Sequence, residues 1–251
     1  MSFTRGAPDW RVGVVIPARN EEHSVAACLR SVLFALDRQG VAPEDRWVVL
    51  VADSCCDSTA DLARRALIGQ GSVLECSVCA PGAARRLGVA QVLTHFAHGP
   101  PSRLWIANTD ADSCVAPDWI ARQLSLAESG YCGVTGIVHV DNDPGLEQGE
   151  LRALLADYTI HDDGTHPHVH GANLGVRADA YLDAGCWMPI ARAEDHCLWS
   201  RIKARGWPTT SCSRTIVRTS GRLHGRAAGG FADTLRHRLQ LLQTGGLACT
   251  P

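Results

Sequence analysis

The chain has 251 residues, of which 45% are hydrophobic, and its 24 basic and 26 acidic side chains give a formal charge of −2. This composition is typical of a globular protein and offers no strongly basic surface, so we expect no nucleic-acid partner. No apolar run approaches the roughly 20 residues of a membrane span, and the first residues lack a signal-peptide pattern. An integral membrane protein and a secreted protein are therefore disfavoured, and a cytoplasmic location is expected.

The first 140 residues alternate between apolar runs and amphipathic segments. The apolar runs predict strands over 12–16, 47–51, 73–78, 104–107 and 133–140. A helix is expected to follow Asn20, with Glu21 and Glu22 in its first turn and Gly40 at its end. Further helices are expected after Asp57 or Ser58, over 82–95 and from residue 117. Four βα units in succession predict a mainly parallel sheet with helices on both faces.

From about residue 141 the pattern is mixed. We expect a helix over 146–158, a histidine-rich loop over 161–170 and a helix over 193–205. A loop rich in glycine and arginine over 213–230 and an amphipathic helix over 231–243 complete the chain. We interpret residues 1–251 as one α/β domain with two halves, about 11–140 and about 141–251, and no linker between them.

Polar clusters follow three of the predicted strands, at residues 17–21, 53–57 and 110–112. The carboxyl ends of parallel strands meet at one edge of the sheet, where such folds bind ligands. Asp110 and Asp112 stand on alternate residues after a strand, so their carboxylates can converge on a hard cation such as Mg²⁺ or Mn²⁺. An isolated Asp-x-Asp sequence is also typical of a solvated turn.

Six elements of the chain occur in an order and spacing that resemble the family 2 glycosyltransferases. They cover about residues 11–206 and are Pro17-Ala-Arg-Asn-Glu21, Asp53-Ser-Cys-Cys-Asp-Ser-Thr59, Gly82-Ala-Ala-Arg-Arg-Leu-Gly88, Asn108-Thr-Asp-Ala-Asp112, Gly171-Ala-Asn173, and Glu194-Asp195 followed by Arg201 and Gly206. Three features depart from the family pattern. Ala52 replaces the first acid of the second element, Arg86 replaces an asparagine, and the Gln-x-x-Arg-Trp motif of processive synthases is absent.

The resemblance implies a GT-A fold and an inverting, metal-dependent transfer of a sugar from a nucleotide-diphosphate sugar to an acceptor hydroxyl. The N-terminal half would bind the nucleotide and the C-terminal half the acceptor. On the donor side the resemblance implies a nucleoside pocket of Pro17, Arg19 and Glu21, a contact of Asp53 with the base, and a contact of Arg85 with the base or diphosphate. Asp110 would bind ribose or metal, and Asp112 would bind metal. On the acceptor side it implies contacts by Gly171, Asn173 and Glu194 and a catalytic base at Asp195.

The chemistry agrees with these implied roles. A divalent cation neutralises the leaving diphosphate, and a carboxylate can take the proton of the attacking hydroxyl. A carboxylate at Asp53 can accept a hydrogen bond from the imide N–H of uracil, which favours a UDP-linked donor. The alternative for Asp195 is a carboxylate that only complements a helix dipole.

The late glycine-rich stretch contains Arg222, His224 and Arg226. Arginine forks suit phosphate oxygens, so Arg222 and Arg226 are candidates for closing over the diphosphate. A solvated loop explains them equally well. His224 is a candidate metal ligand, as a late histidine is in some GT-A enzymes.

Two groups of residues suggest a zinc site. His161, His166, His168 and His170 lie on one segment, and alternate residues of an extended chain share a face. No cysteine or carboxylate completes that set, so we favour acceptor contacts, with Trp187 and Trp199 as candidate stacking or packing residues. Cys76 and Cys79 have half-site spacing, but with eleven cysteines and no second pair we favour buried, inert thiols.

Two other functions are compatible with parts of the sequence. A phosphohydrolase of the haloacid-dehalogenase type also uses Asp-x-Asp, but on its first strand. A non-catalytic nucleotide-sugar binding protein would not need Asp112 and Asp195. The last predicted helix carries Leu235, Leu239 and Leu242, which favour packing onto the domain or a homodimer partner over contact with a membrane-bound lipid acceptor.

Overall fold

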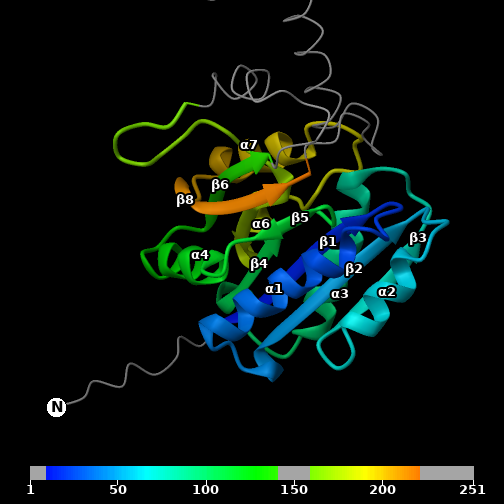
Figure 1. Ribbon diagram of the computed structural model, residues 1–251. Helices are drawn as coiled ribbons and strands as arrows, with labels where there is room; N and C mark the ends of the chain where they lie inside the picture. Colours follow the sequence, from blue (N-terminus) through cyan, green and yellow to red (C-terminus); the bar gives the residue numbers. More distant parts are fainter. Residues whose placement is uncertain (1–9, 141–158, 221–251) are drawn as a thin grey trace, which may run out of the picture.

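The computed structural model describes residues 10–140 and 159–220 (Figure 1). In these residues one sheet has the strand order β3-β2-β1-β4-β7-β6-β8-β5. The strands are β1 Arg11–Ala18, β2 Arg46–Asp53, β3 Gly71–Cys76, β4 Leu104–Asn108, β5 Ser113–Val115, β6 Gly133–Val140, β7 Leu174–Arg177 and β8 Thr209–Thr219. The helices are α1 Val25–Gln39, α2 Thr59–Ala66, α3 Pro81–His95, α4 Trp119–Glu128, α6 Ala178–Asp183 and α7 Glu194–Ala204.

The sheet is mixed but mainly parallel, as the sequence predicts. Strands β3, β2, β1 and β4 are parallel neighbours, and β6 is parallel to β8. Strand β7 is antiparallel to both β4 and β6, and β5 is antiparallel to β8. The α/β fold class is therefore confirmed.

Two apolar layers hold the helices against the sheet. Helices α1, α2 and α4 pack on one face, where Val14, Leu50 and Trp105 are fully buried. Helices α3, α6 and α7 pack on the other, around Val15 and Trp187. Both faces of the central strands are covered, which explains their unbroken apolar runs.

Most predicted elements of the first 140 residues are present, but α1 begins later than expected. It starts at Val25, and Asn20 takes a left-handed φ of 54°. Glu21 and Glu22 belong to the preceding turn because side chains of the next loop bind their N–H groups: Thr59 Oγ1 at 2.7 Å and Asp57 Oδ2 at 3.1 Å. Gly40 closes α1 as predicted, with φ of 72°.

Two expectations are wrong in the described residues. Residues 213–219 form part of β8, because this segment pairs with β6 and β5. Cys79 is exposed, so the pair Cys76 and Cys79 is not buried as expected. The helices expected over 146–158 and 231–243 and the stretch 221–230 lie outside the described residues.

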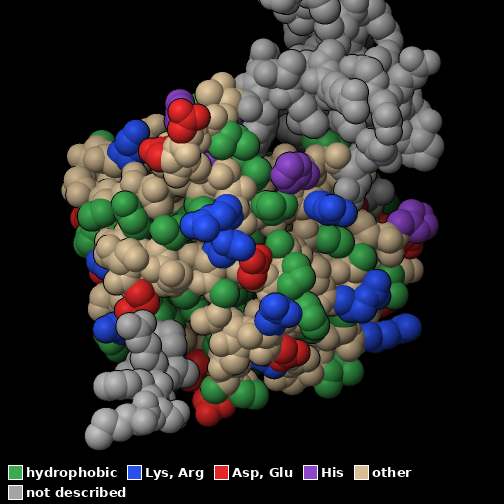
Figure 2. Space-filling model, turned by 60° about the vertical axis from the view of Figure 1, so that its left-hand side comes forward, with side chains coloured by type: hydrophobic (Ala, Val, Ile, Leu, Met, Phe, Trp, Pro, Cys, Tyr) green, Lys and Arg blue, Asp and Glu red, His purple; other side chains and the backbone are tan. Residues whose placement is uncertain are grey.

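The surface agrees with the near-neutral composition. On the coloured part of the face in Figure 2, acidic and basic side chains are interspersed among hydrophobic and polar ones. Within residues 10–140 and 159–220, no helix is long and apolar enough to cross a membrane.

Candidate active site

The carboxyl ends of β1 and β2 carry two loops that bind each other. Asn20 Oδ1 accepts the N–H of Cys56 at 2.8 Å, and the N–H of Asn20 donates to Cys55 Sγ at 3.3 Å. Glu22 accepts the N–H of Ser58 at 3.1 Å. These bonds, with those made to Glu21 and Glu22, fix the relative position of the two loops. The edge predicted to hold the nucleoside is therefore preorganised, with Arg19 exposed and Pro17 partly buried.

Asp53 ends β2 and is 6% exposed. Its Oδ1 accepts the backbone N–H of Cys79 at 3.0 Å and the hydroxyl of Ser54 at 3.1 Å. The thiol of Cys76 also hydrogen-bonds the Asp53 carboxylate. The carboxylate is thus held in place by groups of β3 and of the loops that follow β2 and β3, and as an acceptor it can also bind a ligand N–H.

Asp110 and Asp112 lie between β4 and β5. The strand β5 directly follows Asp112 and pairs with the end of β8, which lies about a hundred residues further along the chain. Through that pairing the hydroxyls of Ser113 and Thr219 each approach Asp112 Oδ1 at 3.4 Å. The contact with Thr219 has no signal in the sequence, because it depends on long-range strand pairing.

Arg85 of α3 connects the Asp-x-Asp motif, formed by Asp110 and Asp112, with α7. Its guanidinium is 3% exposed, donates to Asp110 Oδ1 at 2.6 Å, and forms a second ion pair with Glu194 Oε1. Its charged carbon also lies 5.3 Å from the ring centroid of Trp187. Burial lowers the pKa of Arg85, but Asp110 and Glu194 outweigh this effect and the net shift is upward. The guanidinium is therefore a permanent buried cation between the two halves.

The structure shows how deeply Arg85 and Glu194 lie. Arg85 is buried and reaches the edge of the sheet through its ion pair with Asp110. Glu194 is 8% exposed and its carboxylate is paired with Arg85, and the acceptor contact of Glu194 stays a prediction. Burial raises the pKa of Glu194, and the nearby Arg85 cation opposes that shift.

Asp195 begins α7 beside Glu194 but points in another direction. Its Oδ2 accepts the backbone N–H of Gly171 at 2.8 Å, and its Oδ1 accepts the N–H of His196 at 2.7 Å. Its residue is partly exposed. The Asp195 carboxylate is therefore held in place by two backbone donors at the edge of the site.

Gly171 is needed for a close approach. A Cβ at this position would lie 2.6 Å from Arg85 Nη2, so a side chain here would have to displace the buried guanidinium that the chain passes over. Asn173 is 1% exposed, and its amide binds the carbonyls of Ile137 and Thr215 and the indole N–H of Trp119. Those three bonds hold β6, β8 and α4 around Asn173, and its acceptor contact stays a prediction.

The alternate histidines share a face, as expected. The rings of His166 and His168 are stacked with centroids 5.8 Å apart, and those of His168 and His170 are 6.1 Å apart. Burial lowers the pKa of His170 to about 4, although Asp195 opposes the shift, so the ring is neutral at pH 7.

No group of three His, Cys, Asp or Glu side chains suited to a metal occurs in the described ranges. Arg222, His224 and Arg226 lie outside them.

Comparison with known proteins identifies the class. Residues 8–239 match the family model described as glycosyltransferase like family 2, so the chain belongs to this family and contains a glycosyltransferase domain. The resemblance seen in the six sequence elements is confirmed. Family membership also decides against the phosphohydrolase alternative. No curated protein matches the chain significantly.

Solved structures show the same fold. S. aureus TarS 1–349 in complex with UDP-GlcNAc has a TM-score of 0.62 at 13% identity, over 88% of this chain and 61% of that one. The mannosyltransferase PcManGT from Pyrobaculum calidifontis, in complex with GDP-Man and Mn²⁺, has a TM-score of 0.61 at 16% identity, over 96% and 66%. The chain thus spans about two thirds or less of these proteins, and the expected GT-A fold is confirmed.

Proposed function

We propose that the chain transfers a sugar from a UDP-linked donor to an acceptor hydroxyl with inversion, with Asp195 as the general base and a divalent cation at Asp110 and Asp112. The observation that supports this best is the buried link from Asp110 through Arg85 to Glu194, because it joins the Asp-x-Asp motif to the helix that carries Asp195. A donor diphosphate and an acceptor hydroxyl would therefore meet on one preorganised surface.

The donor side is proposed from the edge formed by β1, β2 and β4. The carboxylate of Asp53 is held by Cys79 and Ser54 and would accept the imide N–H of uracil. Pro17, Arg19 and Glu21 would border the nucleoside, since their loop is tied to the loop after β2. The similar fold of TarS 1–349 was solved in complex with UDP-GlcNAc, which supports a nucleotide-sugar donor for this chain.

The residues at the motif fit a hard cation. Asp110 is 36% exposed, its Oδ1 is held by Arg85, and its Oδ2 receives no hydrogen bond from the described residues. Mg²⁺ and Mn²⁺ prefer oxygen ligands and are often held by one or two carboxylates together with substrate phosphates. Asp112 and Asp110 would hold the ion, which when bound neutralises charge on the diphosphate leaving group. His224 stays a candidate third ligand.

In the chemical step, the hydroxyl oxygen of the acceptor would attack the anomeric carbon while the bond from that carbon to the diphosphate breaks. Asp195 would accept the proton of this hydroxyl. Attack from the face opposite the leaving group inverts the anomeric centre. The N–H groups of Gly171 and His196 would keep the carboxylate oriented for this transfer. Glu194 would not replace Asp195, because its carboxylate is paired with Arg85.

Nucleotide binding with and without Mn²⁺ tests the proposal. Calorimetric titration of UDP, GDP and dTDP should show the tightest binding for UDP, with Mn²⁺ strengthening it. Asp112→Ala should abolish the Mn²⁺-dependent part of UDP binding and keep the circular dichroism spectrum, whereas Asp61→Ala, an exposed change on α2, should bind like the parent. Tighter binding of GDP would overturn the UDP preference, and unchanged UDP affinity in Asp112→Ala with Mn²⁺ would contradict the metal assignment.

A further inference from the structure

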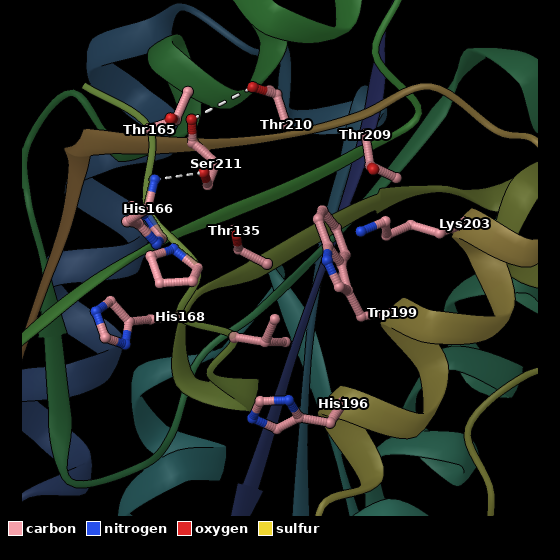
Figure 3. Close-up of a pocket in the computed structure, with 12 residues that line it drawn as sticks. Thr135, Thr165, His166, His168, His196, Trp199, Lys203, Thr209, Thr210 and Ser211 are labelled. Carbon is pink, nitrogen blue, oxygen red and sulfur yellow. Dashed lines mark hydrogen bonds between the residues drawn. The ribbon is translucent and has the colours of Figure 1, made fainter. Parts of the chain in front are cut away.

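A pocket of about 430 Å³ lies beside α7, away from the motif at Asp110 and Asp112. Its floor is the pairing of β6 with β8, its first wall is α7, and its second wall is the segment 165–169 (Figure 3). The N–H of His166 bonds Ser211 Oγ at 2.8 Å and fixes that second wall against the floor. The lining residues are Thr135, Thr165, His166, Pro167, His168, Val169, His196, Trp199, Lys203, Thr209, Thr210 and Ser211.

The wall formed by α7 is continuous with the proposed base. His196, Trp199 and Lys203 are spaced three and four residues apart, so they share one face of the helix. His196 follows Asp195 directly, and Lys203 lies about 10 Å further along the helix axis. A ligand that places one hydroxyl at Asp195 could therefore extend along this face, past Trp199, to the amine of Lys203.

The chemistry of the pocket suits a sugar. Trp199 points into the cavity and offers an aromatic surface to the apolar face of a ring (Figure 3). Hydroxyls of Thr135, Thr209 and Ser211 occupy the floor, and Thr135 Oγ1 is buried with no hydrogen-bond partner in the described residues. Buried polar atoms of this kind cost stability unless something binds them.

The charge of the pocket narrows the ligand further. Lys203 is the single lysine of the chain, is exposed, and forms no ion pair with a described residue. The described lining contains no Asp or Glu side chain. Burial lowers the pKa of His166, so this ring is neutral at pH 7. Lys203 therefore supplies a positive charge that no carboxylate of the described lining neutralises.

We infer that this pocket is an acceptor subsite for a sugar carrying a carboxylate or phosphate, with the ring on Trp199 and the anionic group at Lys203. Calling the ligand an acceptor rests on the proposed function, but its binding does not. The anionic group would lie remote from the reacting hydroxyl, so the pocket would select the acceptor without taking part in the chemical step.

The test is direct binding of three small probes: glucuronic acid, glucose 6-phosphate and glucose. Saturation-transfer NMR and calorimetry are carried out with and without UDP and Mn²⁺. The parent protein should bind at least one anionic sugar about tenfold more tightly than glucose, which corresponds to about 1.4 kcal/mol, because only the anionic sugars pair with the charge of Lys203. Preference for glucuronic acid alone indicates a uronic acid ligand, and preference for glucose 6-phosphate alone indicates a phosphosugar.

Matched variants locate the effect. Lys203→Met should reduce the anionic sugar to the affinity of glucose, while Arg205→Met, which removes an exposed cation paired with Asp183, should keep the preference. Trp199→Leu should weaken all three probes, and Trp199→Phe should retain them. Equal binding of all probes by the parent, binding of none, or a preference that survives Lys203→Met overturns the inference. UDP affinity should be the same in every variant. If the parent protein does not bind UDP, that result contradicts the proposed function and not the sugar pocket.

Discussion

The two halves of the sheet are built by different rules. Strands β3, β2, β1 and β4 are parallel and joined by helices in the order of the chain, and the described β1 and β2 are almost entirely buried. Strands β7, β6, β8 and β5 change direction three times along the sheet, counting the step from β4 to β7, and β8 is only partly buried over most of its length. The first half is an apolar platform, while the second exposes hydroxyls, histidines and a tryptophan to a pocket.

The difference separates the tasks. A donor with a constant nucleotide part suits a rigid edge whose loops are tied together by hydrogen bonds, as at Asn20 and Asp57. An acceptor suits a region where strand ends and loops vary without disturbing the platform. The halves are joined at Arg85, whose buried cation pairs with Asp110 of one and Glu194 of the other. Changes on either side of this junction should therefore have separable effects.

The largest separation is expected for Asp195→Asn. If Asp195 acts only on the acceptor hydroxyl, its loss should lower kcat by about 10²–10⁴ and leave UDP affinity unchanged, since the residues proposed to bind the donor belong to the other half. The measurement is sugar transfer, or slow donor hydrolysis, together with UDP titration.

The matched control for this change is Asp183→Asn, at the exposed end of α6, where Asp183 accepts the indole N–H of Trp207. That variant should keep the parent kcat. Transfer by Asp195→Asn at a rate close to that of the parent would remove Asp195 from its role, and a loss of UDP affinity would show that the halves are not separable.

Arg85→Met tests the junction itself. It leaves Glu194 buried without its cation and frees Asp110, and removing one partner of a buried pair typically costs 3–5 kcal/mol. Denaturant unfolding should show a loss of that size. UDP binding should also weaken, because Asp110 loses its anchor. Adding Glu194→Gln should restore part of the stability, since it removes the stranded charge.

The control for Arg85→Met is Arg46→Met in the N-terminal half. Arg46 is also buried, but its partner Asp37 has a side chain that is 62% exposed and can be hydrated after the change. We expect a smaller loss and parent-like UDP binding. Equal losses in the two variants, with UDP binding unaffected in both, would show that Arg85 is an ordinary core ion pair.

The sequence predicts the first half well because its signals are local. Apolar runs, a closing glycine at Gly40 and the carboxylate of Asp57, which accepts the N–H of Thr59 at the start of α2, each act within a few residues. The predicted start of helix α1 after Asn20 is wrong, because the turn there is held by Thr59 and Asp57, which follow another strand. In the second half the sequence predicts a loop from residue 213, whereas residues 213–219 belong to β8, because this segment pairs with β6 and β5.

The site shows the same division. The motif order indicated which residues gather at the edge, and the structure places Asp53, Asp110 and Asp112 at the ends of β2 and β4. Contacts that depend on packing were beyond the sequence. The burial of Arg85, the three hydrogen bonds of Asn173 and the approach of Thr219 to Asp112 all join segments far apart in the chain. One feature of the sequence does indicate the pocket beside α7: His196, Trp199 and Lys203 are spaced three and four residues apart on the predicted helix over 193–205, so they share one face of it.

The smallest expected effect concerns pH and the second half alone. The pKa of His170 falls from an ordinary value near 6.5 to about 4 in the folded protein, chiefly through burial. Between these values the unfolded chain binds a proton that the folded chain does not, so the free energy of unfolding decreases as the pH falls through 6.5 toward 4. Lowering the pH from 7.5 to 5 should cost about 2 kcal/mol through His170 alone. Denaturant unfolding at both pH values should show that His170→Asn loses less stability than the parent over this interval.

The control is His23→Asn. The side chain of His23 is 88% exposed in the parent, so this variant should show the same pH dependence of stability as the parent. Parallel pH dependence in all three proteins would show that His170 is not held neutral beside Asp195.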